Sequence, residues 1–145
     1  MITARQIELV QLSFARALPD TDALAADFYA RLFALAPDTR ALFRGDMADQ
    51  GRKLFLTLAA VVDALDALDR VLPVAAALAV RHIGYGVQDR HYAAVGDALL
   101  GALAAQLGDR FDVDTRAGWA RAYTLLSDHM RAAAEHARRD RAAAA

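Results

Sequence analysis

The sequence of 145 residues is long enough for one domain with a buried core. It is 57% hydrophobic with a formal net charge of −1, which argues against a disordered chain and leaves no overall field to attract nucleic acid or an anionic membrane. The absence of cysteine excludes disulfides and thiolate metal sites. Neither a leader sequence nor an apolar run long enough to span a bilayer is present, so we expect a cytoplasmic protein without membrane insertion.

Apolar residues recur at helical spacing along the chain, and no alternating pattern predicts a strand. Pro73 is compatible with a helix only near its first turn, while Gly84, Gly86 and Gly108 are helix-stop signals. These signals predict an all-α fold, with one domain over residues 1–131 and an alanine- and arginine-rich helical tail over 132–145 that frays. The predicted helices run from Thr3 to Pro19, over 21–35, 37–43, 48–68, 69–82 and 90–107, and from Asp114 onward.

Three polar residues fall on faces that should turn inward. His82 ends an apolar run, where a neutral imidazole is well placed to ligate a buried metal. Taken alone, such a histidine is more often satisfied within the protein or by solvent. Tyr29 lies in an aromatic segment, and Gln50 begins the apolar stripe of the 48–68 helix. If that helix faces the 69–82 helix across a slot, Tyr29 and Gln50 line one wall and His82 lines the other.

Ordered segments over roughly residues 5 to 130 resemble the bacterial single-domain globins. This group includes Vitreoscilla-type haemoglobin, the globin domain of flavohaemoglobins and the Hell's Gate type globins. The resemblance implies a globin fold, with helices packed around a pocket for haem b. The segments that carry it are Phe28-Tyr29-Ala30-Arg31-Leu32-Phe33, Ala36-Pro37, Leu42-Phe43, Gln50, Arg52-Lys53-Leu54, Arg81-His82, Gly86-Val87, His91-Tyr92, Val95-Gly96, Leu99-Leu100 and Trp119-Ala120-Arg121-Ala122-Tyr123.

The resemblance also implies roles for individual residues. It makes His82 the proximal ligand of the haem iron, Phe43 the ring packed on the haem face, and Leu54 an apolar distal neighbour. Tyr29 and Gln50 match the distal pair, whose hydrogen bonds hold the bound gas and support catalysis. A neutral imidazole is a good axial ligand that leaves the sixth position open. Because glutamine is a poor iron ligand, we expect a five-coordinate ferrous site.

Further positions match contacts around the haem. Leu78, Val87 and Val95 match proximal and rim contacts, and Tyr92 matches a tyrosine near the proximal histidine. The Leu78 carbonyl, one turn before His82, is the expected acceptor that fixes the imidazole orientation. Cations could pair with the haem propionates, although a solvated surface role is as good an interpretation for each. These cations are Arg52, Lys53 and Arg81.

Alternatives remain for several of these residues. Tyr29 could be a core tyrosine bonded to a backbone carbonyl, and Gln50 could turn to solvent. His91 lies at a helix start, where capping or surface exposure is expected. His129 and His136 lie on the polar last helix, where solvation is expected.

One departure from the flavohaemoglobin pattern concerns the last helix. There a glutamate completes a triad with the proximal histidine and the nearby tyrosine, but alignment places Ala134 at this position and Glu135 one residue later. One residue is about 100° around a helix. We therefore expect Glu135 to point elsewhere and the iron to receive a weaker electron push than peroxide cleavage requires.

Three classes of function fit these residues. The first is reversible O₂ binding, with NO and CO as further gaseous ligands. The second is nitric oxide dioxygenation, which needs a separate reductase because the sequence has no dinucleotide-binding glycine motif. The third is gas or redox sensing through a partner protein. The sequence favours an O₂-binding globin with NO detoxification as its protective chemistry.

Overall fold

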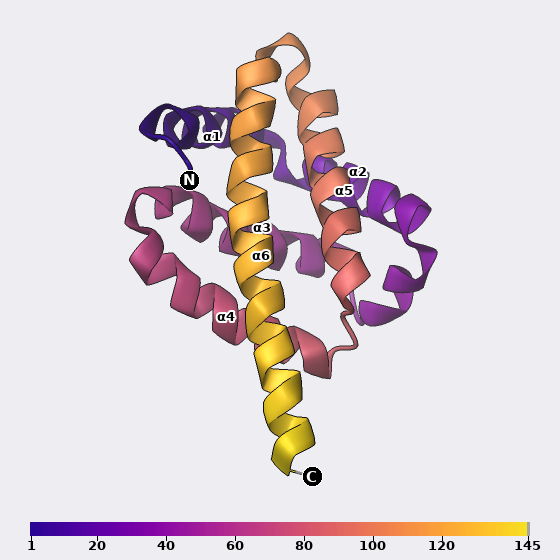
Figure 1. The fold of residues 1–145 in the computed structure, drawn as a ribbon. Coiled ribbons are helices and arrows are strands. Elements are labelled where there is room, and N and C mark those ends of the chain that lie inside the picture. Colours follow the sequence, from indigo (N-terminus) through magenta and orange to yellow (C-terminus); the bar gives the residue numbers. More distant parts are fainter. Residues whose placement is uncertain (145) are drawn as a thin grey trace.

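A computed structural model describes residues 1–144, which contain helices and no strand, so the all-α prediction is confirmed (Figure 1). Ala145, the last residue of the predicted tail, lies outside the described residues. The α-helices are α1 (Ala4–Ala17), α2 (Thr21–Leu35), α3 (Met47–Asp63), α4 (Leu68–Gly84), α5 (Asp89–Leu107) and α6 (Val113–Ala144); short 3₁₀ helices are η1 (Leu18–Asp20), η2 (Pro37–Leu42), η3 (Leu65–Ala67) and η4 (Gly108–Arg110).

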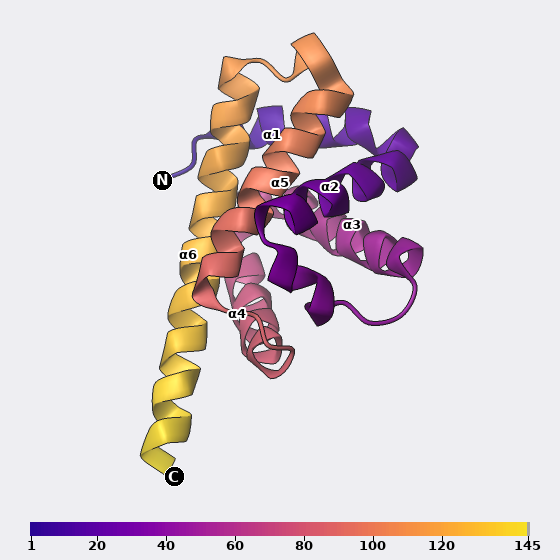
Figure 2. The same cartoon turned by 90° about the vertical axis from the view of Figure 1, so that its right-hand side faces the viewer.

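The helices pack in crossed pairs around one core. α2 packs against α5 and α3, while α6 packs against α1, α4 and α5. The C-terminal end of α6 extends beyond the other helices in both views (Figures 1 and 2). Large side chains from five helices fill the centre, and they include Phe14, Leu24, Leu32, Phe55, Leu103 and Trp119. None of the helices described within residues 1–144 is long and apolar enough to cross a membrane.

A buried hydrogen bond fixes α6 on α1. The indole Nε1 of Trp119 donates to the Ser13 hydroxyl at 2.7 Å, and that hydroxyl donates in turn to the Leu9 carbonyl. Beside it, a Cβ at Gly118 would lie 3.2 Å from the Gln6 carbonyl oxygen. The two helices therefore meet at a position with little room for a larger side chain.

The helix ends follow most of the sequence signals, although α4 continues through Gly84, a predicted stop signal. Thr3 and Gln6 form the predicted capping box, and α5 ends before Gly108. The helix predicted over 48–68 ends instead at Asp63, because Ala64 leaves the helical region (φ −101°, ψ 12°) and the turn buries Leu65. As α4 then begins at Leu68, Pro73 falls in its second turn rather than its first.

Candidate functional site

An aromatic cluster surrounds Tyr29 on α2. The Tyr29 ring lies edge-on to the Phe43 ring at 5.2 Å between centroids and stacks on Phe33 at 5.8 Å. The Arg40 guanidinium lies over the Phe33 ring, 5.1 Å from its centroid. Phe43 follows η2 and is half-buried. The cluster thus joins α2 to the segment after η2 and places Tyr29 and Phe43 in contact.

The Tyr29 hydroxyl is the polar group of this cluster. The residue is 6% exposed, and burial raises the pKa of its phenol to about 12. This hydroxyl forms no hydrogen bond within residues 1–144. It is also not one of the fully inaccessible side-chain atoms that lack a hydrogen-bond partner. The Tyr29 phenol is therefore a protonated donor without a protein acceptor among the described residues. The alternative of a hydroxyl bonded to a backbone carbonyl is not what the structure shows.

Gln50 occupies the first turn of α3 and is half-buried. Its amide Nε2 donates to the Arg44 carbonyl at 2.8 Å, which spans the corner between η2 and α3. The same corner is fixed by the Asp46 carboxylate, which accepts from the Ala48 N–H and caps α3. Gln50 therefore supports the corner with the amide group that the sequence assigns to gas binding.

His82 lies two residues before the end of α4 and is half-buried. Burial lowers the pKa of the imidazole, which keeps the ring neutral, and the Leu78 carbonyl opposes this shift. The His82 Nδ1 atom is nevertheless buried without a hydrogen bond, because the nearby Leu78 carbonyl does not reach hydrogen-bonding geometry. The Tyr85 ring lies 6.0 Å from the imidazole between centroids. This neutral, incompletely satisfied histidine has the chemistry of an axial ligand.

The helix that carries His82 is packed asymmetrically. α4 packs mainly against α6 and also contacts the preceding turn η3, whereas it has few or no contacts with α2 and α3. Its buried residues are Val71, Ala75 and Ala79, whereas Leu78 and His82 are half-buried. Leu78 and His82 thus lie on the same side of α4 as Ala75 and Ala79 but are less completely covered.

The remaining residues predicted to contact haem are either partly buried or exposed. Leu54 and Val95 pack on the core as partly buried side chains, and Val87 is half-buried. Lys53 and Arg81 are exposed, and neither forms an ion pair within residues 1–144. Both are therefore free to meet an anionic group at the molecular surface.

The helix α6 differs from the flavohaemoglobin pattern as the sequence predicts. Ala134 is 2% exposed, whereas the Glu135 side chain is 53% exposed and pairs with Arg138 and Arg139. Tyr92 is buried, which raises the pKa of its phenol, and its backbone carbonyl accepts a hydrogen bond from the Tyr123 hydroxyl. No carboxylate hydrogen-bonds to the Tyr92 hydroxyl within residues 1–144.

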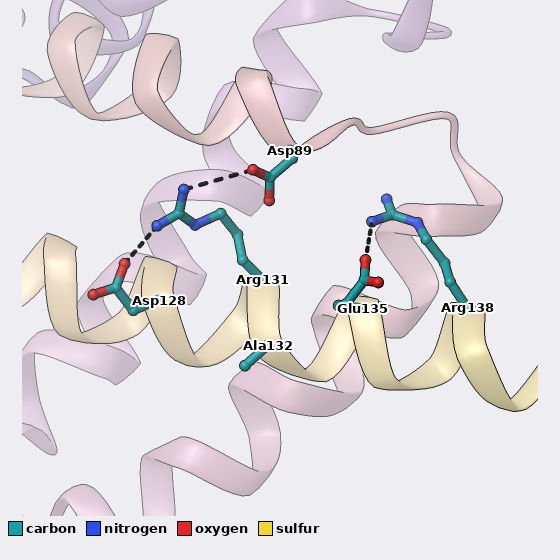
Figure 3. Close-up of a pocket in the computed structure, with 6 residues that line it drawn as sticks. All are labelled: Asp89, Asp128, Arg131, Ala132, Glu135 and Arg138. Carbon is teal, nitrogen blue, oxygen red and sulfur yellow. Dashed lines mark hydrogen bonds and ion pairs between the residues drawn. The ribbon is translucent and has the colours of Figure 1, made fainter.

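Two surface grooves lie along α6 and are lined by none of the predicted site residues. The groove of about 690 Å³ in Figure 3 is lined by Asp89, Asp128, Arg131, Ala132, Glu135 and Arg138. Arg131 pairs with Asp89 and Asp128, and Arg138 with Glu135. The groove is open to solvent, and both of its arginines form ion pairs with its carboxylates, so among the described residues it contains no free cation for a ligand.

Comparison with known proteins identifies the family. Residues 26–130 match the globin family. The chain is 31% identical over 110 residues to a flavohemoprotein of Halalkalibacterium halodurans and 33% identical over 110 residues to one of Bordetella parapertussis. Each alignment covers 74% of this chain and 27% of the relative. The chain thus spans about a quarter of the length of these curated relatives.

The fold is also that of a solved globin. Ferric myoglobin of Aplysia limacina superposes with a TM-score of 0.81 over 92% of this chain and 99% of its own, at 20% identity. The helical fold, the family match and the relatives agree with the resemblance in the sequence. The chain therefore belongs to the globin family, and with it to the haem proteins that bind small gases.

Proposed function

We propose that this globin holds haem b between α4 and the wall of α2 and α3, with His82 as the axial ligand, and binds O₂ reversibly. The observations that support the proposal are the buried phenol of Tyr29, which donates no hydrogen bond within residues 1–144, and the buried Nδ1 atom of His82, which lacks a hydrogen-bond partner. Phe43 and Leu54 would pack on the ring, and Lys53 and Arg81 would neutralise its propionates. Leu78, Val87, Tyr92 and Val95 would line the proximal side and the rim.

The side chains of the protein provide the selectivity for O₂. When bound, haem would supply a coordination position for O₂ and the one electron with which O₂ and NO become nitrate, and an external reductase would restore that electron. Tyr29, which stays protonated, would donate a hydrogen bond to O₂ held in the site. Gln50 adds a second donor once its amide leaves the Arg44 carbonyl. NO dioxygenation with a separate reductase is thus the protective chemistry that we propose, and CO is a competing ligand.

Spectroscopy and exchange kinetics test the binding of haem and gas. Purified protein should show a strong near-ultraviolet haem band that the His82→Ala variant loses while keeping its helicity. Tyr29→Phe should release O₂ about ten- to a hundredfold faster, because a hydrogen bond to a charged group contributes about 1.5–3 kcal/mol. Tyr85→Phe is the matched control, since Tyr85 is 62% exposed. Normal haem binding by His82→Ala would refute the ligand assignment, and unchanged O₂ release by Tyr29→Phe would refute the donor assignment.

A separate assay tests the proposed catalysis. NO consumption is measured with a supplied flavin reductase, with and without O₂. The proposal expects consumption that requires O₂ and yields one nitrate per NO. Consumption at the rate of the reductase alone would limit the function to gas binding.

A further inference from the structure

A buried histidine outside the proposed haem ligands joins two distant segments. His91 lies in the first turn of α5, and its side chain is 4% exposed. Its Nδ1 accepts from the Gln88 N–H at 2.9 Å, and its Nε2 lies 2.9 Å from the Asp38 carboxylate. One accepted and one donated bond fit a neutral imidazole with its proton on Nε2. Both nitrogens are therefore used within the protein, which leaves none for a metal.

The acceptor, Asp38, lies on η2 and is 53 residues away in the sequence. It also accepts from Arg90, and the hydrogen bonds from Arg90 and His91 keep the pKa of its carboxyl well below the usual range. The Arg90 side chain is 59% exposed, where ion pairs contribute little. The bond from His91 is shielded from water at its donor end, so we assign it the larger part in holding η2.

The opposite end of η2 makes a second contact. A Cβ at Gly86 would lie 3.3 Å from the Leu42 side chain, and Gly86 adopts φ +92°. Gly86 belongs to the loop that follows α4, the helix that carries His82. The segment η2 therefore touches this loop near Leu42 and the start of α5 at Asp38.

These contacts link the two walls of the proposed haem site. η2 leads directly into Phe43, whose ring lies against Tyr29, and the loop touched by Leu42 leads back to His82. We propose that His91 is a positioning residue, which fixes η2 and the Phe43 ring relative to the His82 loop through Asp38 and so sets how firmly the chain retains haem. The part that concerns haem rests on the proposed function; the part that concerns η2 does not.

Amide hydrogen exchange of the haem-free protein tests the link to η2. The Thr39 and Phe43 amides donate to the Ala36 and Arg40 carbonyls within this segment. In Asp38→Ala they should exchange about ten- to a hundredfold faster, because loss of a charge-assisted hydrogen bond favours local opening. Asp38→Asn keeps an acceptor oxygen and should restore most of the protection. His91→Ala should have the same effect as Asp38→Ala. Because Asp38 is exposed, Asp38→Ala removes the same hydrogen bond without removing a buried side chain.

Haem release tests the consequence for binding. Transfer of haem from the loaded protein to an excess of apomyoglobin should be at least tenfold faster in Asp38→Ala and His91→Ala than in the wild type. Two controls should leave the rate nearly unchanged. Arg90→Ala removes the exposed pair with Asp38 and an exposed hydrogen bond to the Gln88 side chain but keeps the His91–Asp38 bond, and Thr3→Ala removes the α1 cap, far along the chain from η2.

The outcomes separate the two proposals. Unchanged exchange at Thr39 and Phe43 would overturn the role of His91 in fixing η2. Faster exchange with unchanged haem release would overturn its role in haem retention. A wild-type chain that binds no haem would contradict the proposed function, while the exchange measurement would still decide whether His91 fixes η2.

Discussion

Gly51 on α3 lies against Ala25 on α2 so closely that a Cβ at Gly51 would be 2.8 Å from the Ala25 Cβ. Both atoms are attached directly to the backbone, so neither can rotate away. The same added Cβ would lie 3.6 Å from the Tyr29 ring, which follows Ala25 by one turn. The contact therefore fixes the crossing of α2 and α3, and with it the position of Tyr29 beside the start of α3.

We expect Gly51→Ala to destabilise the protein by about 1–3 kcal/mol, because the extra methyl group forces the two helices apart. Urea unfolding of the haem-free protein followed by circular dichroism measures this change. Gly84→Ala is the matched control. Gly84 is also helical but has nothing within 4 Å of an added Cβ, so alanine should be neutral or slightly stabilising there. Equal effects of the two substitutions would contradict the steric explanation.

The bond between Trp119 and Ser13 gives a second stability prediction. Ser13→Ala leaves a buried indole N–H without an acceptor, so we expect a loss of about 1–3 kcal/mol. Combining it with Trp119→Phe should cost less than the sum of the two single changes, because the phenylalanine has no N–H to leave unpaired. Thr57→Ala, which changes an exposed hydroxyl on α3, should stay within about 0.5 kcal/mol. A double variant that loses as much stability as the two single variants together would contradict a coupling between Ser13 and Trp119.

The sequence is a good guide to the helices and a poor guide to the polar contacts between distant segments. Periodic apolar residues and capping signals predict the helices, since both are local. The early end of α3 was missed because burial of Leu65 depends on the packed core. The contact of Asp38 with His91 was missed because no local pattern joins residues 53 positions apart. The hydrogen bond from Gln50 to the Arg44 carbonyl depends on the backbone conformation of the corner between η2 and α3, which the sequence pattern does not specify.

Gln50 should contribute less than Tyr29 to O₂ retention. Its amide is occupied by the Arg44 carbonyl, and breaking that bond offsets part of any gain from a bond to the gas. We therefore expect Gln50→Leu to accelerate O₂ release by less than Tyr29→Phe does, as measured by stopped-flow displacement with CO. The reverse order would show that the corner rearranges when haem and gas bind, and that glutamine is the principal donor.

The Tyr29 phenol should resist deprotonation in the folded, haem-free protein. Burial raises its pKa to about 12, from the ordinary value of about 10. A raised pKa of an acid means that burial favours the neutral form, so its contribution to stability is complete below about pH 10 and is lost as the pH rises through about 12. The difference in tyrosinate absorbance between the wild type and Tyr29→Phe should stay near zero up to about pH 11. A titration step near pH 10 without unfolding would contradict this burial.

The orientation of α6 predicts that Glu135 does not act on the proximal side. Its carboxylate is more than half exposed and pairs with arginines of its own helix, so Glu135→Gln should change stability by less than about 0.5 kcal/mol. The iron–histidine stretching frequency in the resonance Raman spectrum of the ferrous protein should stay unchanged. Ala134→Glu should behave differently, because it places a carboxyl group at a position that is 2% exposed.

Burial raises the pKa of such a carboxyl, because the charged form destabilises the fold more than the neutral form does. Ala134→Glu should therefore be less stable than the wild type at pH 7 and should recover part of the difference as the pH falls through the raised pKa toward about 4. Thermal unfolding at pH 5 and pH 7 measures this recovery. If Glu135→Gln shifted the iron–histidine frequency while Ala134→Glu left stability unchanged, the helix would be rotated by one residue from the orientation described, and Glu135 would be the missing member of the triad.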